Sequence, residues 1–242
     1  KEDVFPECDQ FNGIHEGLVQ SWKDIFPKKG EIHFAGALEN NEDTGTLQYL
    51  ASTAMEVGFS TRVLDMQALD LQNGRFFDPA GELVNRCFKL YPWEWMVDES
   101  PDGCLAEMEW LEPIWKLVMS NKAILATLYE LFPDSPYVLP CYLSRPRSGL
   151  FCKKPVFSRE GHNVSVVDIR DWEEYVRIAE TEGDYNTGAY VYQEYVEPTA
   201  YSGRYPVIGS WIIGGEAAGI GIRENRMEVT DNLSEFVPHI IG

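Results

Sequence analysis

The sequence predicts a mixed α/β (α+β) fold built in two parts. In the first part, a predicted helix at 10–26 precedes a strand, a helix and a strand at 31–37, 44–58 and 61–65, an alternation typical of a parallel sheet. Beyond residue 137, short strands alternate with glycine-rich turns and one expected helix, which indicates an antiparallel sheet with a covering helix. Apolar residues make up 44% of the 242, enough for a packed core.

Apolar spacing supports each element of the first part. Ile14, Leu18, Trp22 and Ile25 recur at intervals of three and four residues, so they share one face of a helix. The runs at 31–37 and 61–65 are short and apolar, as strands are. Further strands are expected on either side of turn signals, at 76–78 and 82–90.

Residues 91–103 contain several breakers, so the sequence predicts a loop there. Its segment Tyr91-Pro92-Trp93-Glu94-Trp95 either packs inside the protein or borders a pocket for an amine. Helices are expected at 104–119 and 121–131, and Ser120 is the expected N-cap of the second. A domain boundary is expected near 118–120.

The second part has a different pattern. Asp168 is the expected N-cap of a helix over 168–181, and Gly214-Gly215 is typical of a tight hairpin turn between two strands. The expected strands are short runs at 150–154, 189–196, 206–213 and 217–223.

Composition restricts the class of protein. The net charge of −19 disfavours nucleic-acid partners, because polyanions are repelled. No apolar run approaches the roughly 18 residues that a membrane-spanning helix needs. The five cysteines are an odd number with no CxxC pair, and the four histidines are scattered. We therefore expect a cytoplasmic protein with free thiols, without a membrane or nucleic-acid partner.

The most informative stretch for chemistry runs from Lys153 to Asn163. An expected strand delivers Lys154 and stops at Pro155, and a turn carrying Arg159 and Gly161 follows. Phosphate binding needs fixed positive charge and a backbone that approaches closely, which Lys, Arg and Gly provide. A solvated hairpin with basic residues on its rim explains the same pattern equally well.

Three other segments are candidates for a ligand site. Lys122 lies at the start of a helix, where anions are attracted. Gln193 and Glu194 lie on a strand whose edge could read adenine, and Arg223 ends a strand where it could clamp a phosphate or a carboxylate. For each of them a purely structural role remains open: a surface lysine, an ordinary strand and a solvent-facing arginine. The sequence has no Walker-type GxxxxGK[ST] loop, GxGxxG fingerprint or HExxH motif.

Taken together, several motifs resemble the glutathionylspermidine synthase family, whose ligase part is an ATP-grasp domain. The resemblance covers most of 85–240 and is looser over the first 80 residues, including Phe11–Glu16. The matching motifs are FKLYPWEW (88–95), SNKAIL (120–125), LFP (131–133), KPVFSREGHN (154–163), YQE (192–194), GSW (209–211), GEAAGIGIR (215–223) and NLSEFVPH (232–239).

The resemblance implies both a fold and a reaction. Residues 1–118 would form a smaller, Rossmann-like pre-ATP-grasp unit, and residues 119–242 the ATP-grasp nucleotide-binding region. In that family ATP phosphorylates a carboxylate, and an amine attacks the acyl phosphate to give an amide. The implied substrates are a glutathione-like carboxylate and a polyamine-like amine.

The resemblance also implies roles for individual residues. Lys122 and Lys154 would hold ATP phosphates, and Arg159 would cover them. The strand with Gln193 and Glu194 would meet the adenine. Arg223 would act catalytically, binding the anionic centre where the acyl phosphate forms, and Glu235 would lie near the amine.

The sequence departs from the family in one respect. The family's Mg²⁺ ligands lie in an Arg-x-Asp … Glu-x-Asn pattern upstream of the region that matches Phe11, and that pattern is missing here. The sequence thus resembles a C-terminal portion of a member without the amidase domain, with the Mg²⁺ ligands outside this chain. The alternatives are a catalytically inactive nucleotide- or ligand-binding module and a small-molecule phosphotransferase.

Overall fold

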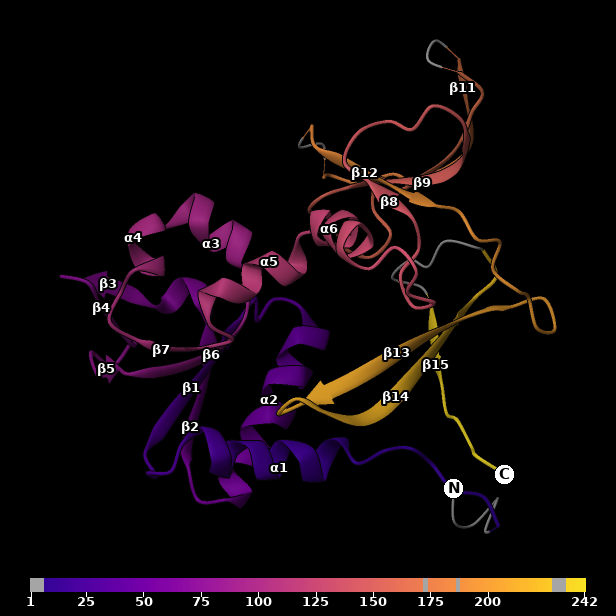
Figure 1. Ribbon diagram of the computed structural model, residues 1–242. Helices are drawn as coiled ribbons and strands as arrows, with labels where there is room; N and C mark the ends of the chain where they lie inside the picture. The colour runs from indigo at the N-terminus through magenta and orange to yellow at the C-terminus, as the bar shows by residue number, and fades with distance from the viewer. Residues whose placement is uncertain (1–6, 172–173, 186–187, 228–233) are drawn as a thin grey trace. The chain divides into compact units, whose positions relative to one another are not determined.

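The computed structural model describes residues 7–171, 174–185, 188–227 and 234–242. The chain divides into two compact units (Figure 1). Unit 1 contains residues 1–117, 210–220 and 241–242, and unit 2 contains residues 118–209 and 221–240. Helices and strands are both abundant, so the predicted mixed α/β fold is confirmed.

Unit 1 is organised around a parallel sheet with the strand order β2-β1-β6-β7. All three pairings in this sheet are parallel, as the strand–helix–strand alternation predicted. The strands are β1 (Glu31–Gly36), β2 (Ser60–Asp65), β6 (Arg86–Leu90) and β7 (Glu109–Leu111).

Two amphipathic helices, α1 (Ile14–Ile25) and α2 (Asn41–Glu56), pack with this sheet. The Asn40 side chain caps α2 by accepting the Glu42 N–H. Between the helices and the sheet, Trp22 packs edge-on against Phe34 and donates its indole N–H to the Thr53 hydroxyl at 2.9 Å. Both partners of that hydrogen bond are buried, so it satisfies the one polar atom of the indole inside the core.

A small antiparallel sheet and two short helices build a second core in unit 1. The predicted loop at 91–103 is wrong, because α3 begins at Trp93, directly after Pro92, and buries Trp93 and Met96. Of the aromatic segment, Trp93 therefore packs inside the protein, with its indole bonded to the Glu112 carbonyl, whereas Trp95 is 39% exposed. The elements are η1 (Met66–Ala68), β3 (Asp70–Gln72), β4 (Arg75–Phe77), β5 (Leu83–Val84), α3 (Trp93–Glu99) and α4 (Pro101–Cys104).

The predicted helix at 104–119 is also wrong. Residues Glu109–Leu111 form β7 and pair with β6, and Pro113 precedes a short 3₁₀ turn, η2 (Ile114–Lys116). Only the single turn α5 (Leu117–Ser120) is helical at the end of this stretch. Pairing with an existing sheet edge overrides a local helical pattern here.

Unit 2 contains a five-stranded sheet with the order β11-β10-β9-β12-β8. Helix α6 (Ala123–Leu131) packs on it, with Ala126 against Val191 and Cys141. The predicted N-cap is wrong: the cap position is Lys122, and Asn121 rather than Ser120 accepts a free N–H, that of Ala123. The strands are β8 (Cys141–Tyr142), β9 (Gly149–Pro155), β10 (Ser165–Ile169), β11 (Tyr175–Glu180) and β12 (Tyr190–Glu194).

The predicted helix at 168–181 is replaced by an antiparallel hairpin of β10 and β11. Residues 172–173, within the predicted helix, lie outside the described residues. Asp171 accepts the Glu174 N–H at 2.8 Å. The β-branched and aromatic residues of both strands favour β structure, and β9 supplies the edge on which β10 pairs.

A three-stranded antiparallel sheet is formed by β13 (Tyr205–Ile213), β14 (Glu216–Asn225) and β15 (Glu235–Val237). The predicted tight turn at Gly214-Gly215 is confirmed, with φ angles of 61° and 90° that favour glycine. Within unit 1, the Gly13 N–H bonds to the Ala218 carbonyl, which ties the start of α1 to β14.

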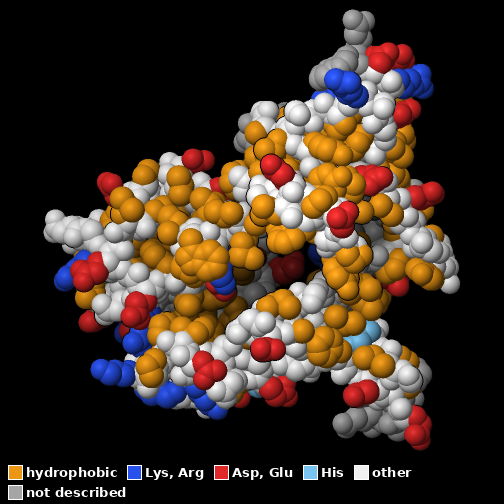
Figure 2. Space-filling view, viewed as in Figure 1, with side chains coloured by type: hydrophobic (Ala, Val, Ile, Leu, Met, Phe, Trp, Pro, Cys, Tyr) orange, Lys and Arg blue, Asp and Glu red, His pale blue; other side chains and the backbone are white. Residues whose placement is uncertain are grey.

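Charge is distributed rather than concentrated on the face that Figure 2 shows, where carboxylates lie among lysines, arginines and apolar side chains. In the described part of the chain, no helix has the length and hydropathy needed to span a membrane.

The Trp22–Thr53 hydrogen bond generates a test of the unit 1 core. Thr53→Val keeps the shape of the side chain but leaves the buried indole N–H without its acceptor. We expect the free energy of unfolding, measured by urea denaturation, to fall by about 1–3 kcal/mol. The exposed neighbour Ser52 is the control, since Ser52→Ala is expected to cost less than about 0.5 kcal/mol. Equal losses in the two variants would contradict this account.

His33 generates a second test, of pH dependence. Burial lowers the pKa of His33 below its usual 6.5, while Glu31 and Asp78 oppose the shift and Arg62 adds to it. The unfolded chain therefore binds the proton more tightly than the folded one. Stability contributed by the neutral ring is fully present above pH 6.5 and is lost as the pH falls through the lowered pKa.

We expect the midpoint of urea unfolding to drop between about pH 7 and about pH 5 less steeply in His33→Phe than in the parent chain. His162→Phe, the same substitution at a partly exposed ring, is the matched control for replacing a histidine by phenylalanine. An unchanged slope in His33→Phe would show that other groups set the acid sensitivity.

Candidate functional site

Strand β9 positions Lys154 in the interior of the five-stranded sheet. It pairs with β10 on one edge and β12 on the other, with Lys154 opposite Val191. Because side chains alternate along strands, Lys154 and Gln193 lie on the same face. The Lys154 ammonium donates to the Gln193 side-chain oxygen at 2.7 Å. Two of the predicted site residues are thus brought into direct contact.

The first residue before α6 is fixed to the end of β9. The Lys122 backbone N–H bonds to the Val156 carbonyl at 2.8 Å, two residues beyond Lys154. The Lys122 ammonium donates to the Ser158 carbonyl at 2.5 Å and lies 3.0 Å from the Ser158 hydroxyl. Both predicted lysines therefore border the segment that follows β9.

The loop that carries Arg159 has a backbone shaped by three residues with positive φ: Glu160 (56°), Gly161 (73°) and Asn163 (55°). Thr181 holds this loop, because its hydroxyl contacts the Gly161 carbonyl and accepts the Val164 N–H at 3.0 Å. Arg159 is partly buried, and its carbonyl accepts the His162 N–H. Arg159 is therefore held in a loop anchored on both sides.

Lys154 lies beside the neutral side chains of Gln193, Cys141 and Cys152. Burial raises the pKa of the Cys141 and Cys152 thiols, and the Lys154 charge lowers both only in part, so both thiols remain protonated at neutral pH. Lys154 forms no ion pair with any carboxylate of the described residues. Its positive charge is thus available to an anion that displaces the Gln193 amide oxygen.

The opposite face of the sheet carries Lys153, whose ammonium lies 4.0 Å from the Tyr190 ring centre. A cavity of about 550 Å³ opens beside the start of α6 and is lined by Asn121, Val156, Tyr190 and Tyr192, among others. By strand alternation, Tyr190 and Tyr192 lie on the Lys153 face, not on the face of Lys154.

Arg223 and Glu235 lie on a different sheet from the lysines. Arg223 is opposite Phe236 in the β14–β15 register, and Glu235 is opposite Glu224. Residues directly opposite share a face, so Arg223 and Glu235 point to opposite faces. The Arg223 guanidinium lies 5.6 Å from the Phe236 ring centre, and Glu235 accepts a 2.8 Å hydrogen bond from Arg204.

This combination of two lysines, a glutamine and an anchored glycine-containing loop fits an anion-binding site, and comparison with known proteins assigns the family. A family model described as "Glutathionylspermidine synthase preATP-grasp" matches residues 1–242. The chain belongs to the glutathionylspermidine synthase family. The family resemblance predicted from the sequence motifs is therefore confirmed.

Curated relatives extend over nearly the whole chain. A Haemophilus influenzae protein with the name "Putative acid--amine ligase" is 35% identical over 96% of the chain and 62% of its own length. Trypanothione synthetase of Crithidia fasciculata is 28% identical over 86% of the chain and 35% of its own length. Bifunctional glutathionylspermidine synthetase/amidase of Escherichia coli is 26% identical over 95% of the chain and 42% of its own length. The chain thus spans between about a third and two thirds of these relatives.

The residues of this family member that hold the site together include two that sequence reasoning did not single out. Ser158 belongs to the motif KPVFSREGHN but is not among the predicted site residues. In the structure its carbonyl accepts from the Lys122 ammonium. Thr181 lies at the end of the helix predicted for 168–181, and in the structure its hydroxyl anchors the loop from the far side. Asn232 and Leu233, part of the motif that contains Glu235, lie outside the described residues.

A metal site does not emerge from the described residues. In the ranges 7–171, 174–185, 188–227 and 234–242, no group of three or more His, Cys, Asp or Glu side chains is placed to hold a metal ion.

The anchoring of the loop generates a test. Thr181→Val removes the hydroxyl that accepts the Val164 N–H. We expect hydrogen–deuterium exchange at residues 159–164 to become at least about 5-fold faster, because the loop opens more often. Thr199→Val, the same substitution at an exposed position elsewhere in unit 2, should leave the rate unchanged. Unchanged exchange in Thr181→Val would show that the loop is held by other contacts.

Proposed function

We propose that this chain forms the nucleotide-binding part of an ATP-dependent ligase that joins a carboxylate to an amine. ATP transfers its γ-phosphoryl group to the carboxylate and leaves as ADP. The amine then attacks the acyl phosphate, forming the amide and releasing phosphate. The observation that carries the proposal is the Lys154–Gln193 contact beside the loop that Lys122 and Thr181 hold in place.

Lys122 and Lys154 hold the phosphates of ATP in this proposal. Their ammonium groups contact neutral oxygens of Ser158 and Gln193, which phosphate oxygens can replace with stronger, charge-assisted hydrogen bonds. Arg159 lies on the adjoining loop, and the backbone there is shaped to approach an anion closely. Electrostatic stabilisation of this kind is the main protein contribution to phosphoryl transfer.

The remaining assignments rest on the family motifs. The strand that carries Gln193 and the exposed Glu194 meets the adenine, with its backbone groups near the end of β12. Arg223 binds the developing acyl phosphate, and Glu235 binds the ammonium of the amine. Since the two side chains point to opposite faces of β14–β15, the acid and the amine approach this sheet from different sides.

The substrate class follows from the names of the relatives. Glutathionylspermidine synthetase and trypanothione synthetase point to a glutathione-like carboxylate and a polyamine-like amine. ATP requires Mg²⁺ in reactions of this type, and among the described residues no group of three or more His, Cys, Asp or Glu side chains is placed to hold a metal ion.

Calorimetry of ATP binding with Mg²⁺ tests the nucleotide site. Lys154→Ala is expected to weaken binding by at least about 10-fold, because it removes a charge-assisted contact to phosphate. Lys153→Ala is the matched control: it removes the same charge from the next residue, on the opposite face of the sheet, and should change the affinity by less than about 2-fold.

Equal effects of the two substitutions would mean that Lys154 contributes only general charge, and the site would be assigned elsewhere. Product analysis with glutathione and spermidine then separates the reactions. An amide together with ADP supports the ligase, and a phosphoester would identify a phosphotransferase. ATP binding without turnover would identify a nucleotide-binding module.

A further inference from the structure

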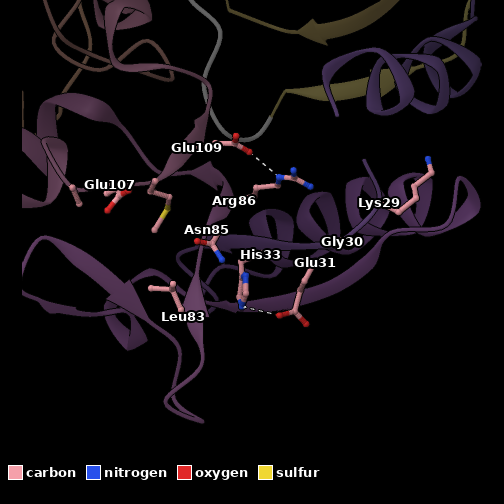
Figure 3. A pocket seen from close by; sticks show the side chains of 11 residues that line it. Lys29, Gly30, Glu31, His33, Leu83, Asn85, Arg86, Glu107 and Glu109 are labelled. Carbon is pink, nitrogen blue, oxygen red and sulfur yellow. Dashed lines mark hydrogen bonds and ion pairs between the residues drawn. The ribbon is translucent and has the colours of Figure 1, made fainter. Parts of the chain in front are cut away.

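Unit 1 contains a cavity of its own, at the end of the parallel sheet where the strands begin (Figure 3). Its volume is about 800 Å³, within the range of small-molecule sites. Glu31 opens β1, Arg86 opens β6 and Glu109 opens β7, and all three line the cavity. Ligands of open α/β sheets usually bind at the carboxyl ends of the strands, which lie at the opposite end of the sheet. None of the residues proposed for the ligase reaction lines this cavity.

His33 lies at this cavity with both ring nitrogens unsatisfied. The residue is only 1% exposed, and neither Nδ1 nor Nε2 has a hydrogen-bond partner among the described residues. The nearest carboxylate oxygens are 3.8 Å (Glu31) and 3.9 Å (Asp78) from Nε2, too far for a hydrogen bond. Figure 3 shows the ring near the side chains of Glu31, Leu83 and Asn85. Buried polar atoms nearly always have a hydrogen-bond partner. A ligand can therefore supply the partner that this ring lacks.

The three glutamates that line the cavity each use one oxygen in an ion pair and keep the other available. The Glu31 Oε2 atom faces His33, and the second oxygens of Glu107 and Glu109 have no hydrogen bond among the described residues. The pairs are Arg62–Glu31 at 2.7 Å, Arg75–Glu107 at 2.8 Å and Arg86–Glu109 at 2.7 Å.

Of the two cationic side chains that line the cavity, Arg86 is bound to carboxylate and carbonyl oxygens, and Lys29 lies over an aromatic ring. Arg86 bonds to Glu109 and to the Lys28 carbonyl, and the Lys29 ammonium lies 4.4 Å from the Phe59 ring centre. The capacity that remains is therefore mainly that of hydrogen-bond acceptors. A ligand that carries N–H donors and positive charge matches it, whereas an anion would face three carboxylates.

We infer that this cavity binds a small molecule with a primary or secondary ammonium group. The ammonium, which has two or three N–H donors, donates to the unprotonated nitrogen of His33 and to one or two of the free glutamate oxygens, while its alkyl stem lies along Leu83 and Met108. The inference goes beyond the proposed ligase function and does not depend on it, because the cavity shares no residue with the nucleotide site.

Histidine NMR provides a local readout. The four histidines are labelled with ¹³C at Cε1, and the His33 signal is assigned by its loss in His33→Gln. The probe is n-butylammonium, titrated at a constant pH of about 7.5, with 1-butanol and butyrate as controls of equal chain length. We expect a saturable shift of the His33 signal with the amine alone.

The double variant Glu107→Gln/Glu109→Gln should weaken this binding by about 10-fold, because two charged acceptors are lost. Glu39→Gln/Glu42→Gln, which removes the same charge from exposed positions of unit 1, should bind like the parent chain. The inference is overturned if the His33 signal does not move, if butyrate or butanol moves it equally, or if the two double variants bind alike. Since the measurement contains no ATP, failure of the ligase proposal leaves its outcome unaffected.

Discussion

The pairing of β9 on both edges is the constraint on which the candidate site depends. With β10 on one side and β12 on the other, the strand cannot rotate or slip without moving every side chain to the wrong face. Lys154 is thereby fixed on the Gln193 side. The strand ends at Pro155, which has no N–H to continue the ladder, and the chain turns into the loop that Lys122 and Thr181 hold.

The Lys154 site differs from unit 1 in the groups that its cationic side chain contacts. The protein carries a net charge of −19, and in unit 1 the arginines Arg62, Arg75 and Arg86 are paired with glutamates. In unit 2, by contrast, the Lys154 ammonium contacts a neutral amide, next to thiols that burial keeps protonated. A positive charge in a neutral, partly buried setting is better suited to an incoming phosphate than one already matched by a carboxylate. The cavity at His33 is suited to a cation instead, since its free groups accept hydrogen bonds.

The errors in the sequence-based fold have a common cause. The segment at 168–181 has a capping residue and a suitable length, and 104–119 has apolar residues near helical spacing, so local signals favour helices in both. In each case a neighbouring strand offers an unpaired edge, and backbone pairing with β9 or β6 outweighs a weak helical preference. The loop predicted for 91–103 is wrong in the opposite direction: Pro92 breaks the interior of a helix, but proline is well tolerated at a helix start.

The sequence by itself determined the fold class, the family and the types of residue available for anion binding, because apolar periodicity and the motifs around Lys122, Lys154 and Gln193 are local properties of the chain. Only the tertiary structure decided which side chains meet. Strand alternation separates Lys154 from Lys153, register places Arg223 and Glu235 on opposite faces, and packing leaves His33 buried without a partner. These outcomes depend on contacts between residues far apart in the sequence. The local sequence around one such residue does not show which residue it contacts.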